Sequence, residues 1–311
     1  MISNEELSFI VQGEVTELTK KTTESIRNFF PGSKIIISTW QNSDVNNLDF
    51  DDLILSKDPG GIKAKVNGGT VNLLRQIIST LTGLKNCKTD YAIKIRSDMA
   101  FFGNNLLHHY SKFKNFQRSK GHFISRVMIL ENGTLNPNNL YEMPFHFGDW
   151  FYFGKTKDLL KIFSINFSKE DELENAFYWK KRPFPINNIN KKYFMRYRAE
   201  TILTYFHISK KINLTLSHSN DVSSDNIQQS EFHLVNDYLL ANMNNIQLIN
   251  LKHINTSYLS TWVRYSFNEW LLLHKIFFMK KNIFFYKLIY KIHCVFKFII
   301  ATILYKLKFL K

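Results

Sequence analysis

The chain contains few of the residues that characterise disulfide-rich, disordered or fibrous proteins. Only two of its 311 residues are cysteines, Cys87 and Cys294, and their separation matches no metal-binding or redox motif. Six prolines and 12 glycines are too few for a disordered or fibrous chain. The first residues, MISNEELSFIVQG, also lack the basic and then apolar pattern of a signal peptide. We therefore expect a globular protein with reduced thiols that stays in the cytoplasm.

Several catalytic motifs are absent as well. The sequence has no Walker A loop, no GxSxG elbow, no HExxH helix and no zinc-ligand spacing. The short glycine motifs DPGG (58–61) and NGG (67–69) do not match a dinucleotide-binding fingerprint. These absences remove the strongest support for an ATPase, a serine hydrolase or a zinc protease.

Acidic residues are missing from residues 270–311. This segment holds nine of the 41 lysine and arginine residues and none of the 26 aspartate and glutamate residues. The formal charge of +15 for the whole chain therefore falls to +6 for residues 1–269, which have 32 basic and 26 acidic side chains. Because the body is only mildly basic, we do not expect nucleic acid as its partner. The charge distribution predicts a body at 1–269 and a basic helical tail at 270–311.

The tail has the pattern of an amphipathic helix. Its longest stretch without a charge is FIIATILY, eight residues, whereas a membrane-spanning helix needs about 20. Lys280, Lys287 and Lys291 fall near one helical face, and most large apolar residues lie away from it. This arrangement is typical of a helix that lies in the interface of an anionic membrane. A pair of core helices packed on the body, or a nucleic-acid-binding arm, are the alternatives.

The first 100 residues alternate between strand and helix patterns. Apolar residues in NLLRQIISTLTGLK (72–85) recur at helical spacing, and other runs are short and continuously apolar. The expected strands are 7–13, 34–40, 51–61 and one that starts at residue 91, and the expected helices are 16–32 and 72–85. Such alternation predicts an α/β fold with a mostly parallel sheet and helices on both of its faces.

The middle of the chain is less regular. Residues 180–198 are basic and interrupted by proline and asparagine, which predicts an exposed loop, and residues 217–231 are polar enough to be mobile. The remaining expected elements are strands at 121–130 and 145–154 and helices at 155–163 and 199–208.

Polar residues follow several of the expected strands, where ligands bind in parallel sheets. Asp98 has the oxygen ligands that Mg²⁺ or Mn²⁺ prefers and would hold such an ion against a diphosphate. Arg96 suits phosphate through its planar donors. Alternatively, Asp98 caps the next turn or pairs with Arg96. The residues at these strand ends are Gln12, Gly13, Asp58, Arg96, Ser97 and Asp98. Possible further metal ligands, which no spacing selects, are His146, His207, His218 and His253.

Two other acids stand in apolar surroundings. Asp149 interrupts the aromatic run FHFGDWFYFG, so its carboxylate must be paired, hydrogen-bonded or open to a cleft. Such a group would align or deprotonate an acceptor hydroxyl, with Trp150 as a stacking face for a sugar. Glu200 opens an expected helix. There it is either an acid that the helix dipole stabilises in the first turn, or a general base or acceptor ligand.

In order along the chain, SFIVQGEV, SIRNFFPGSKIIISTW, NLLRQIISTLTGLKNCKTDYAIKIRSDM, GDWFYFG and AETILTYF resemble the WavE-type lipopolysaccharide biosynthesis family of bacterial glycosyltransferase-like proteins. The resemblance spans roughly residues 7–210 and is most specific between Asn72 and Asp98. It implies a GT-A-like nucleotide-sugar-binding fold. In that fold an acid at the end of the fourth strand meets the donor diphosphate through a divalent metal ion.

The resemblance also implies roles for individual residues. Asp98 matches the second acid of a DxD motif, whereas Arg96 stands in the place of the first and would itself neutralise phosphate. The strand-end turn at Gln12 and Gly13 would approach the nucleotide, Asp58 would accept from the base or ribose, and Arg75 would reach phosphate. Asp149 or Glu200 would be the acceptor-side carboxylate.

The function that follows is transfer of a sugar from a nucleotide-sugar donor to a bacterial surface glycan at the inner-membrane face. The acceptor would belong to lipopolysaccharide, lipooligosaccharide or capsule. A sugar-phosphate nucleotidyltransferase is one alternative, although the N-terminal IVQGEVTEL lacks the glycine-rich, basic signature expected of it. A non-enzymatic module that binds a membrane or nucleic acid through the tail is the other.

Overall fold

A seven-stranded central sheet organises the chain, with strand order β10-β8-β9-β6-β1-β2-β3. The computed structural model describes residues 2–63, 70–165, 196–209, 215–252, 258–279 and 281–308. The strands of the sheet are β1 (Leu7–Gln12), β2 (Lys34–Trp40), β3 (Asp52–Ser56), β6 (Tyr91–Arg96), β8 (Val127–Leu130), β9 (Phe151–Lys155) and β10 (Tyr238–Ala241). Neighbouring strands are parallel except at β9, which runs antiparallel to both β6 and β8. The sheet is therefore mostly parallel, as predicted.

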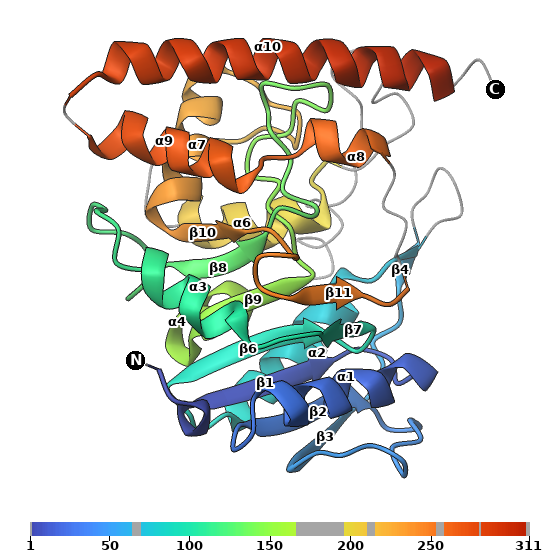
Figure 1. The fold of residues 1–311 in the computed structure, drawn as a ribbon. Helices are drawn as coiled ribbons and strands as arrows, with labels where there is room; N and C mark the ends of the chain where they lie inside the picture. The colour runs from blue at the N-terminus through green and yellow to red at the C-terminus, as the bar shows by residue number, and fades with distance from the viewer. Residues whose placement is uncertain are drawn as a thin grey trace.

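Two small antiparallel pairs and a set of helices complete the fold (Figure 1). The pairs are β7 (Met99–Phe101) with β11 (Leu248–Asn250), and β4 (Ile62–Lys63) with β5 (Thr70–Val71). Among the described residues, the α-helices are α1 (Glu17–Phe29), α2 (Leu73–Asn86), α3 (Asn105–Phe113), α4 (Thr156–Phe163), α6 (Ala199–Ser209), α7 (Ser224–Asn236), α8 (Tyr258–Val263), α9 (Phe267–Phe278) and α10 (Ile283–Lys308).

Alternating side chains of β1 bind helices to opposite faces of the sheet. Phe9 packs against Phe30, just past the end of α1, with ring centroids 5.1 Å apart. Its neighbour Ile10 points to the other face, where a Cβ on Gly83 of α2 would come within 2.4 Å of it. Because successive side chains of a strand point to opposite faces, one apolar run can anchor both helical layers.

The structure corrects three local predictions. The strand expected at 121–130 is confined to β8, and the strand expected at 145–154 begins only at Phe151. Phe145 has a positive φ of 58°, which is incompatible with a regular strand. Residues 217–231 were expected to be mobile, but α7 begins within them, with the Ser223 hydroxyl accepting from the backbone N–H of Asn226. The predictions at residues 67–69, at 180–195, at His253 and at Lys280 lie outside the described residues.

Helix α9 belongs to the main core. Its Trp270 is fully buried, and the indole N–H donates to the carbonyls of Leu234 and Tyr238 at 3.1 Å each. Leu273 is buried in the same cluster. The boundary predicted between residues 269 and 270 therefore falls inside a helix that packs on the body.

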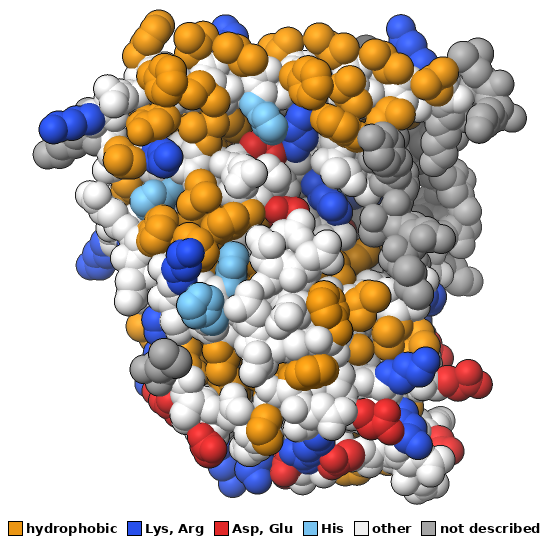
Figure 2. Space-filling view, viewed as in Figure 1, with side chains coloured by type: hydrophobic (Ala, Val, Ile, Leu, Met, Phe, Trp, Pro, Cys, Tyr) orange, Lys and Arg blue, Asp and Glu red, His pale blue; other side chains and the backbone are white. Residues whose placement is uncertain are grey.

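Helix α10 packs against α8 and α9 through a seam that contains polar groups. The Tyr290 hydroxyl donates to Glu231 at 2.6 Å, and Lys297 Nζ donates to Glu269 at 2.7 Å. The side chains of Lys297 and Glu269 are only 5% and 1% exposed. Figure 2 shows hydrophobic side chains on the outside of the molecule along the edge where α10 lies in Figure 1. By length and composition, the stretch Ile283–Leu307 is sufficient to cross a membrane.

The Lys297–Glu269 pair should dominate the attachment of α10. Burial raises the pKa of the Glu269 carboxyl, but the nearby His293 side chain and the charge and hydrogen bond of Lys297 outweigh burial and bring the pKa to about 2. Because this pKa lies below the ordinary value of 4.5, the carboxylate stabilises the fold above pH 4.5. That contribution, about 3 kcal/mol, is lost as the pH falls from 4.5 towards 2.

We predict that Lys297→Met lowers the free energy of unfolding at neutral pH by about 3–5 kcal/mol, because it leaves the Glu269 carboxylate buried without its cation. Urea denaturation followed by circular dichroism measures the loss. Adding Glu269→Gln to the same chain should restore part of it, since the amide carries no charge. An unchanged urea midpoint in the single variant would contradict the prediction.

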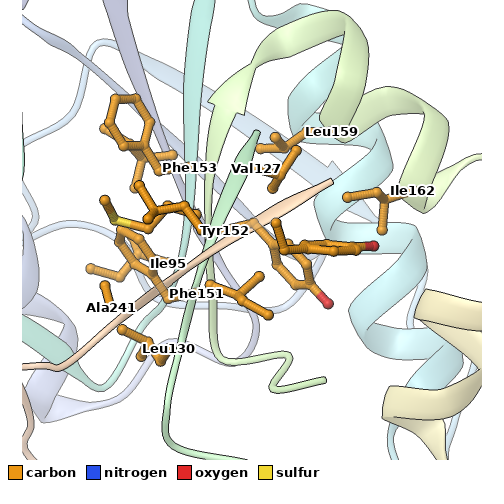
Figure 3. Packing of buried hydrophobic residues seen from close by; sticks show 14 of the residues in the cluster. Ile95, Val127, Leu130, Phe151, Tyr152, Phe153, Leu159, Ile162 and Ala241 are labelled. Carbon is orange, nitrogen blue, oxygen red and sulfur yellow. The ribbon is translucent and has the colours of Figure 1, made fainter. Parts of the chain in front are cut away.

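Packing on both faces of β9 fixes the register of this strand, which follows directly after Asp149 and Trp150. Phe151 and Phe153 lie on one face of the sheet, whereas Tyr152 lies on the other, towards Leu159 and Ile162 of α4 (Figure 3). All five side chains are at most 1% exposed. A one-residue slip would exchange the two faces, so the register of β9 against β6 is well determined.

Candidate functional site

A pocket of about 680 Å³ lies at the carboxyl ends of β1 and β6 and beside the first turn of α2. A volume of this size suits a small-molecule ligand. The predicted site residues that line it are Gln12, Gly13, Asp58, Arg75, Arg96, Ser97, Asp98 and Asp149. Glu200, the remaining predicted residue, does not line it, although its neighbour Ala199 does. The exposed acids Glu14 and Glu17 also line the pocket.

The end of β1 makes a sharp turn at the pocket wall. Gly13 has a φ of +110°, a conformation that favours glycine. A Cβ there would lie 3.8 Å from Ser97 Oγ, an ordinary contact, so backbone conformation rather than lack of space selects glycine. Gln12 Oε1 accepts from the Ser79 hydroxyl at 2.9 Å, and the Ser97 hydroxyl donates to the Glu14 carbonyl at 2.6 Å. The first bond ties the end of β1 to α2, and the second joins the segments that follow β1 and β6.

Asp58 and Arg75 form an ion pair across the pocket rim. Arg75 Nε donates to Asp58 Oδ1 at 2.8 Å, and Nη2 donates to Oδ2 at 2.6 Å. The hydrogen bonds from Arg75 lower the pKa of the Asp58 carboxyl. Both side chains remain 36% exposed. The pair links the loop after β3 to the first turn of α2 and presents both residues to a ligand.

A second arginine–aspartate pair lies deeper in the same pocket. Arg96 Nε donates to Asp98 Oδ1 at 2.8 Å, and Nη2 donates to Oδ2 at 2.5 Å. Burial raises the pKa of the Asp98 carboxyl, but the hydrogen bonds and charge of Arg96 outweigh it, so the net pKa lies below the ordinary value. The Arg96 guanidinium also lies over the Trp150 ring, 5.5 Å from its centroid. This is the ion pair that the sequence offered as the alternative to a metal ligand.

Asp149 reaches the same edge of the sheet because β9 is antiparallel to β6. Ile95, near the carboxyl end of β6, pairs with Phe151, the first residue of β9. The residues that enter β9 therefore lie beside Arg96, which ends β6. Asp149 and Trp150 both line the pocket as a result.

The backbone around Asp149 is held by two side chains from neighbouring elements. Its carbonyl accepts from Gln76 Nε2 at 2.9 Å and from Lys94 Nζ, which also donates to the Trp150 carbonyl at 3.3 Å. The preceding residue is Gly148, where a Cβ would lie 2.2 Å from a backbone carbonyl oxygen. Only glycine allows this close approach, so the position of Asp149 is tightly determined.

Burial shifts the protonation of the groups behind this wall. It lowers the pKa of the fully buried Lys94 to about 7. Burial and then the negative charge of Glu200 raise the pKa of the Asp149 carboxyl. Glu200 Oε2 lies 3.5 Å from His146 Nε2, and His146 Nδ1 hydrogen-bonds to the Gly133 carbonyl at 2.8 Å. A carboxyl with a raised pKa in a pocket is suited to accept a proton near neutral pH.

Sequence reasoning missed three residues of this region. Trp40 ends β2 and lines the pocket, as the strand-end argument could have indicated. Lys252 also lines it, because β11 pairs with β7 and the Leu251 N–H donates to the Asp98 carbonyl at 2.8 Å. Nothing local in the sequence indicates that contact. Lys94 could have been noticed in the sequence, because a lysine within an apolar strand must find buried partners there.

The described side chains do not form a preformed divalent-cation site around Asp98. Both of its carboxylate oxygens accept from Arg96. Within the described ranges, the cluster with metal-ligand spacing is His122, His233 and Asp237, which does not include Asp98. Of the histidines considered as ligands, His207 Nε2 contacts the Tyr238 hydroxyl, and His218 Nδ1 accepts from the Asn220 N–H. A divalent ion therefore does not fit this donor set, and we assign it no step.

Comparison with known proteins gives one family. No curated protein matches the chain significantly. A family model described as WavE lipopolysaccharide synthesis matches residues 7–308, which include every strand of the sheet and every residue of the pocket. Because this match covers nearly the whole chain, the protein belongs to the WavE lipopolysaccharide synthesis family.

Proposed function

We propose that the protein is a glycosyltransferase with a GT-A-like fold that moves a sugar from a nucleotide-sugar donor to a bacterial surface glycan. Membership of a lipopolysaccharide synthesis family supports a biosynthetic role. The observation that carries the proposal is the pocket itself. It lies at the carboxyl edge of a mostly parallel sheet and combines two arginines with a half-buried aspartate whose pKa is raised.

The donor half of the pocket would be built by β1, β6 and α2. Arg96 meets the diphosphate with the guanidinium donors that Asp98 does not use, and Asp98 fixes the orientation of that guanidinium. Lys252, on the same wall, adds a second cation. The turn at Gly13 lets the nucleotide approach the backbone, and the Asp58–Arg75 pair lies where the base or ribose would contact the rim.

The acceptor half would centre on Asp149. Its carboxylate takes the proton from an acceptor hydroxyl while the oxygen of that hydroxyl bonds to the anomeric carbon of the sugar. The bond between that carbon and the diphosphate oxygen breaks, and the nucleoside diphosphate leaves with the electron pair. Arg96 stabilises the charge that develops on this leaving group. Trp150 offers an aromatic face beside the same carboxylate.

The reaction would take place at the cytoplasmic face of the inner membrane. The acceptor of such an enzyme is a glycan, or a lipid-linked glycan held at that surface, of lipopolysaccharide, lipooligosaccharide or capsule. The long apolar helix α10 is consistent with work beside a membrane. No nucleic acid takes part.

A donor screen tests the function. The purified protein is incubated with UDP-, GDP- and CMP-linked sugars and an extract of bacterial glycolipids, and release of the free nucleotide is followed. We expect release from one class of donor that depends on the acceptor and is lost in Asp149→Asn. Release of pyrophosphate from a nucleoside triphosphate and a sugar phosphate would instead indicate a nucleotidyltransferase.

We predict that donor binding does not depend on a divalent ion, because Arg96 occupies both oxygens of Asp98. The increase in melting temperature caused by the active donor should be the same with EDTA as with Mn²⁺ or Mg²⁺. The free nucleoside diphosphate serves as the control ligand, since it carries the same diphosphate. A shift that appears only with the metal ion would contradict this prediction.

A further inference from the structure

Helix α10 is inverted relative to an ordinary surface helix. The residues that face the body recur at helical spacing and include polar and charged groups: Tyr290, Cys294, Lys297 and Ala301. In a helix that packs on a soluble core, this inner face is normally apolar and the outer face polar. Here a buried ion pair lies inside, and the large apolar side chains lie outside.

The outer face of α10 is a continuous apolar surface. The exposed fraction of the side chains on this face is 46% for Leu288, 60% for Ile292, 52% for Val295 and 51% for Ile299. The helix is 26 residues long. A helix of that length extends about 39 Å, so a strip about 10 Å wide covers on the order of 400 Å². Patches of that size on soluble proteins usually mark a contact surface. We call this strip the outer α10 face.

The exposed charged side chains of the α10 segment, residues 281–308, are all lysines in the part that the structure describes. Lys281 and Lys306 are exposed near its two ends, and Lys287 and Lys291 are exposed along it. Residues 270–311 contain no aspartate or glutamate. Two copies that met through this face would bring their lysines together, which is unfavourable. Anionic lipid headgroups would pair with those lysines, and the acyl chains below would cover the apolar strip.

We infer that the protein docks on an anionic lipid surface through the outer α10 face, with α10 lying parallel to the membrane plane. A crossing orientation would expose the buried Lys297–Glu269 pair to hydrocarbon or pull it apart. The flat orientation leaves that pair inside the protein and immerses only residues that are already exposed. β3, at the edge of the sheet farthest from α10, then points away from the membrane (Figure 1). The inference deepens the proposed location and stands whatever reaction the pocket performs.

Vesicle flotation of the full-length chain tests the docking surface. The probes are phosphatidylcholine vesicles with and without phosphatidylglycerol. The wild-type protein should float with the anionic vesicles, and added salt should weaken its binding. Leu288→Gln with Ile292→Gln should weaken it about 10-fold to 100-fold, because two apolar side chains no longer enter the acyl region. Lys287→Gln with Lys291→Gln should weaken binding about tenfold or more, and only on anionic vesicles.

A matched pair of substitutions outside α10 controls for added polarity. Leu55 and Ile124 are 46% and 59% exposed, close to the 46% and 60% of Leu288 and Ile292. Leu55→Gln with Ile124→Gln should leave flotation unchanged. Urea midpoints of all three double variants should match the wild type, because every altered side chain is solvent-exposed.

Three results would overturn the inference. If Leu288→Gln with Ile292→Gln floats as well as the wild type, the outer α10 face does not contact the membrane. Bound wild-type protein that resists an alkaline carbonate wash would indicate a crossing helix. A dimer in lipid-free solution that this double variant converts to a monomer would show that a second copy covers the strip. Nucleotide release with a soluble acceptor is measured separately, so loss of docking and failure of the proposed function can be distinguished.

Discussion

Asp149→Asn is expected to lower kcat about 100-fold to 10,000-fold, the range that a positioned general base contributes. The amide cannot take a proton from the acceptor hydroxyl. Donor binding and the urea midpoint should change little, since Gln76 and Lys94 still hold the backbone carbonyl of residue 149. Asp90→Asn, at the opposite end of β6, is the control and should retain full activity.

The pH dependence of the wild-type enzyme should identify the same carboxylate. Asp149 must be ionised to act, so activity falls as the pH drops below its raised pKa. Glu200→Gln removes the neighbouring negative charge that helps to raise this pKa. The acid limb of kcat should therefore move to lower pH in Glu200→Gln. Two results would show that Asp149 is not the general base. One is that kcat falls at the same acidic pH in Glu200→Gln as in the wild type, and the other is that Asp149→Asn keeps the wild-type kcat.

Much of the sheet could be predicted because its strands bury continuous apolar runs. β1, β2 and β6 each read as strands in the sequence, and α2 reads as a helix from its apolar spacing. Their order along the chain then predicts parallel pairing, and parallel pairing brings the strand-end residues together. Six of the nine predicted site residues follow parallel strands and line one pocket for this reason: Gln12, Gly13, Asp58, Arg96, Ser97 and Asp98. Their chemical roles remain predictions.

What the sequence could not supply was the direction of β9 and the long-range partners. The aromatic run around Asp149 predicts burial whichever way the strand runs, and only antiparallel pairing with β6 takes Asp149 to the pocket. The contact of Leu251 with the Asp98 carbonyl joins segments far apart in the chain, without any local pattern. The burial of Lys297 likewise depends on Glu269, which lies on another helix. Each of these is decided by tertiary packing.

Helix α7 shows the opposite failure, because a polar sequence need not be mobile. Its buried face includes Ser230 and His233, whose partners are the Phe145 N–H and the Asp237 carboxylate. A polar side chain can be buried when it satisfies a specific partner. Composition alone shows that these side chains are polar, but it does not show which hydrogen-bond partners they have in the folded protein.

Substitutions of Arg96 and Asp98 should have the second large effect, which is on donor binding. Arg96→Met is expected to weaken binding of the active donor about 10-fold to 100-fold, since charged hydrogen bonds to the diphosphate are lost. Asp98→Asn should weaken it as well and abolish turnover at low donor concentration, while leaving the fold intact. Isothermal titration measures both affinities. Arg27→Met is the matched control, because Arg27 forms a similar pair with Asp49 outside the pocket.

The double variant Arg96→Met with Asp98→Asn distinguishes two ways in which Asp98 could contribute to donor binding. If Asp98 serves by orienting Arg96, its carboxylate has nothing left to orient once residue 96 is methionine. Arg96→Met with Asp98→Asn should then bind the donor no more weakly than Arg96→Met alone. If Asp98 instead contacts the donor through a metal ion, the two losses should add, and Mn²⁺ should strengthen binding to Arg96→Met but not to the double variant. Additive losses with that metal response would show that the guanidinium does not replace the cation, and that the Arg96–Asp98 bonds open when the donor binds.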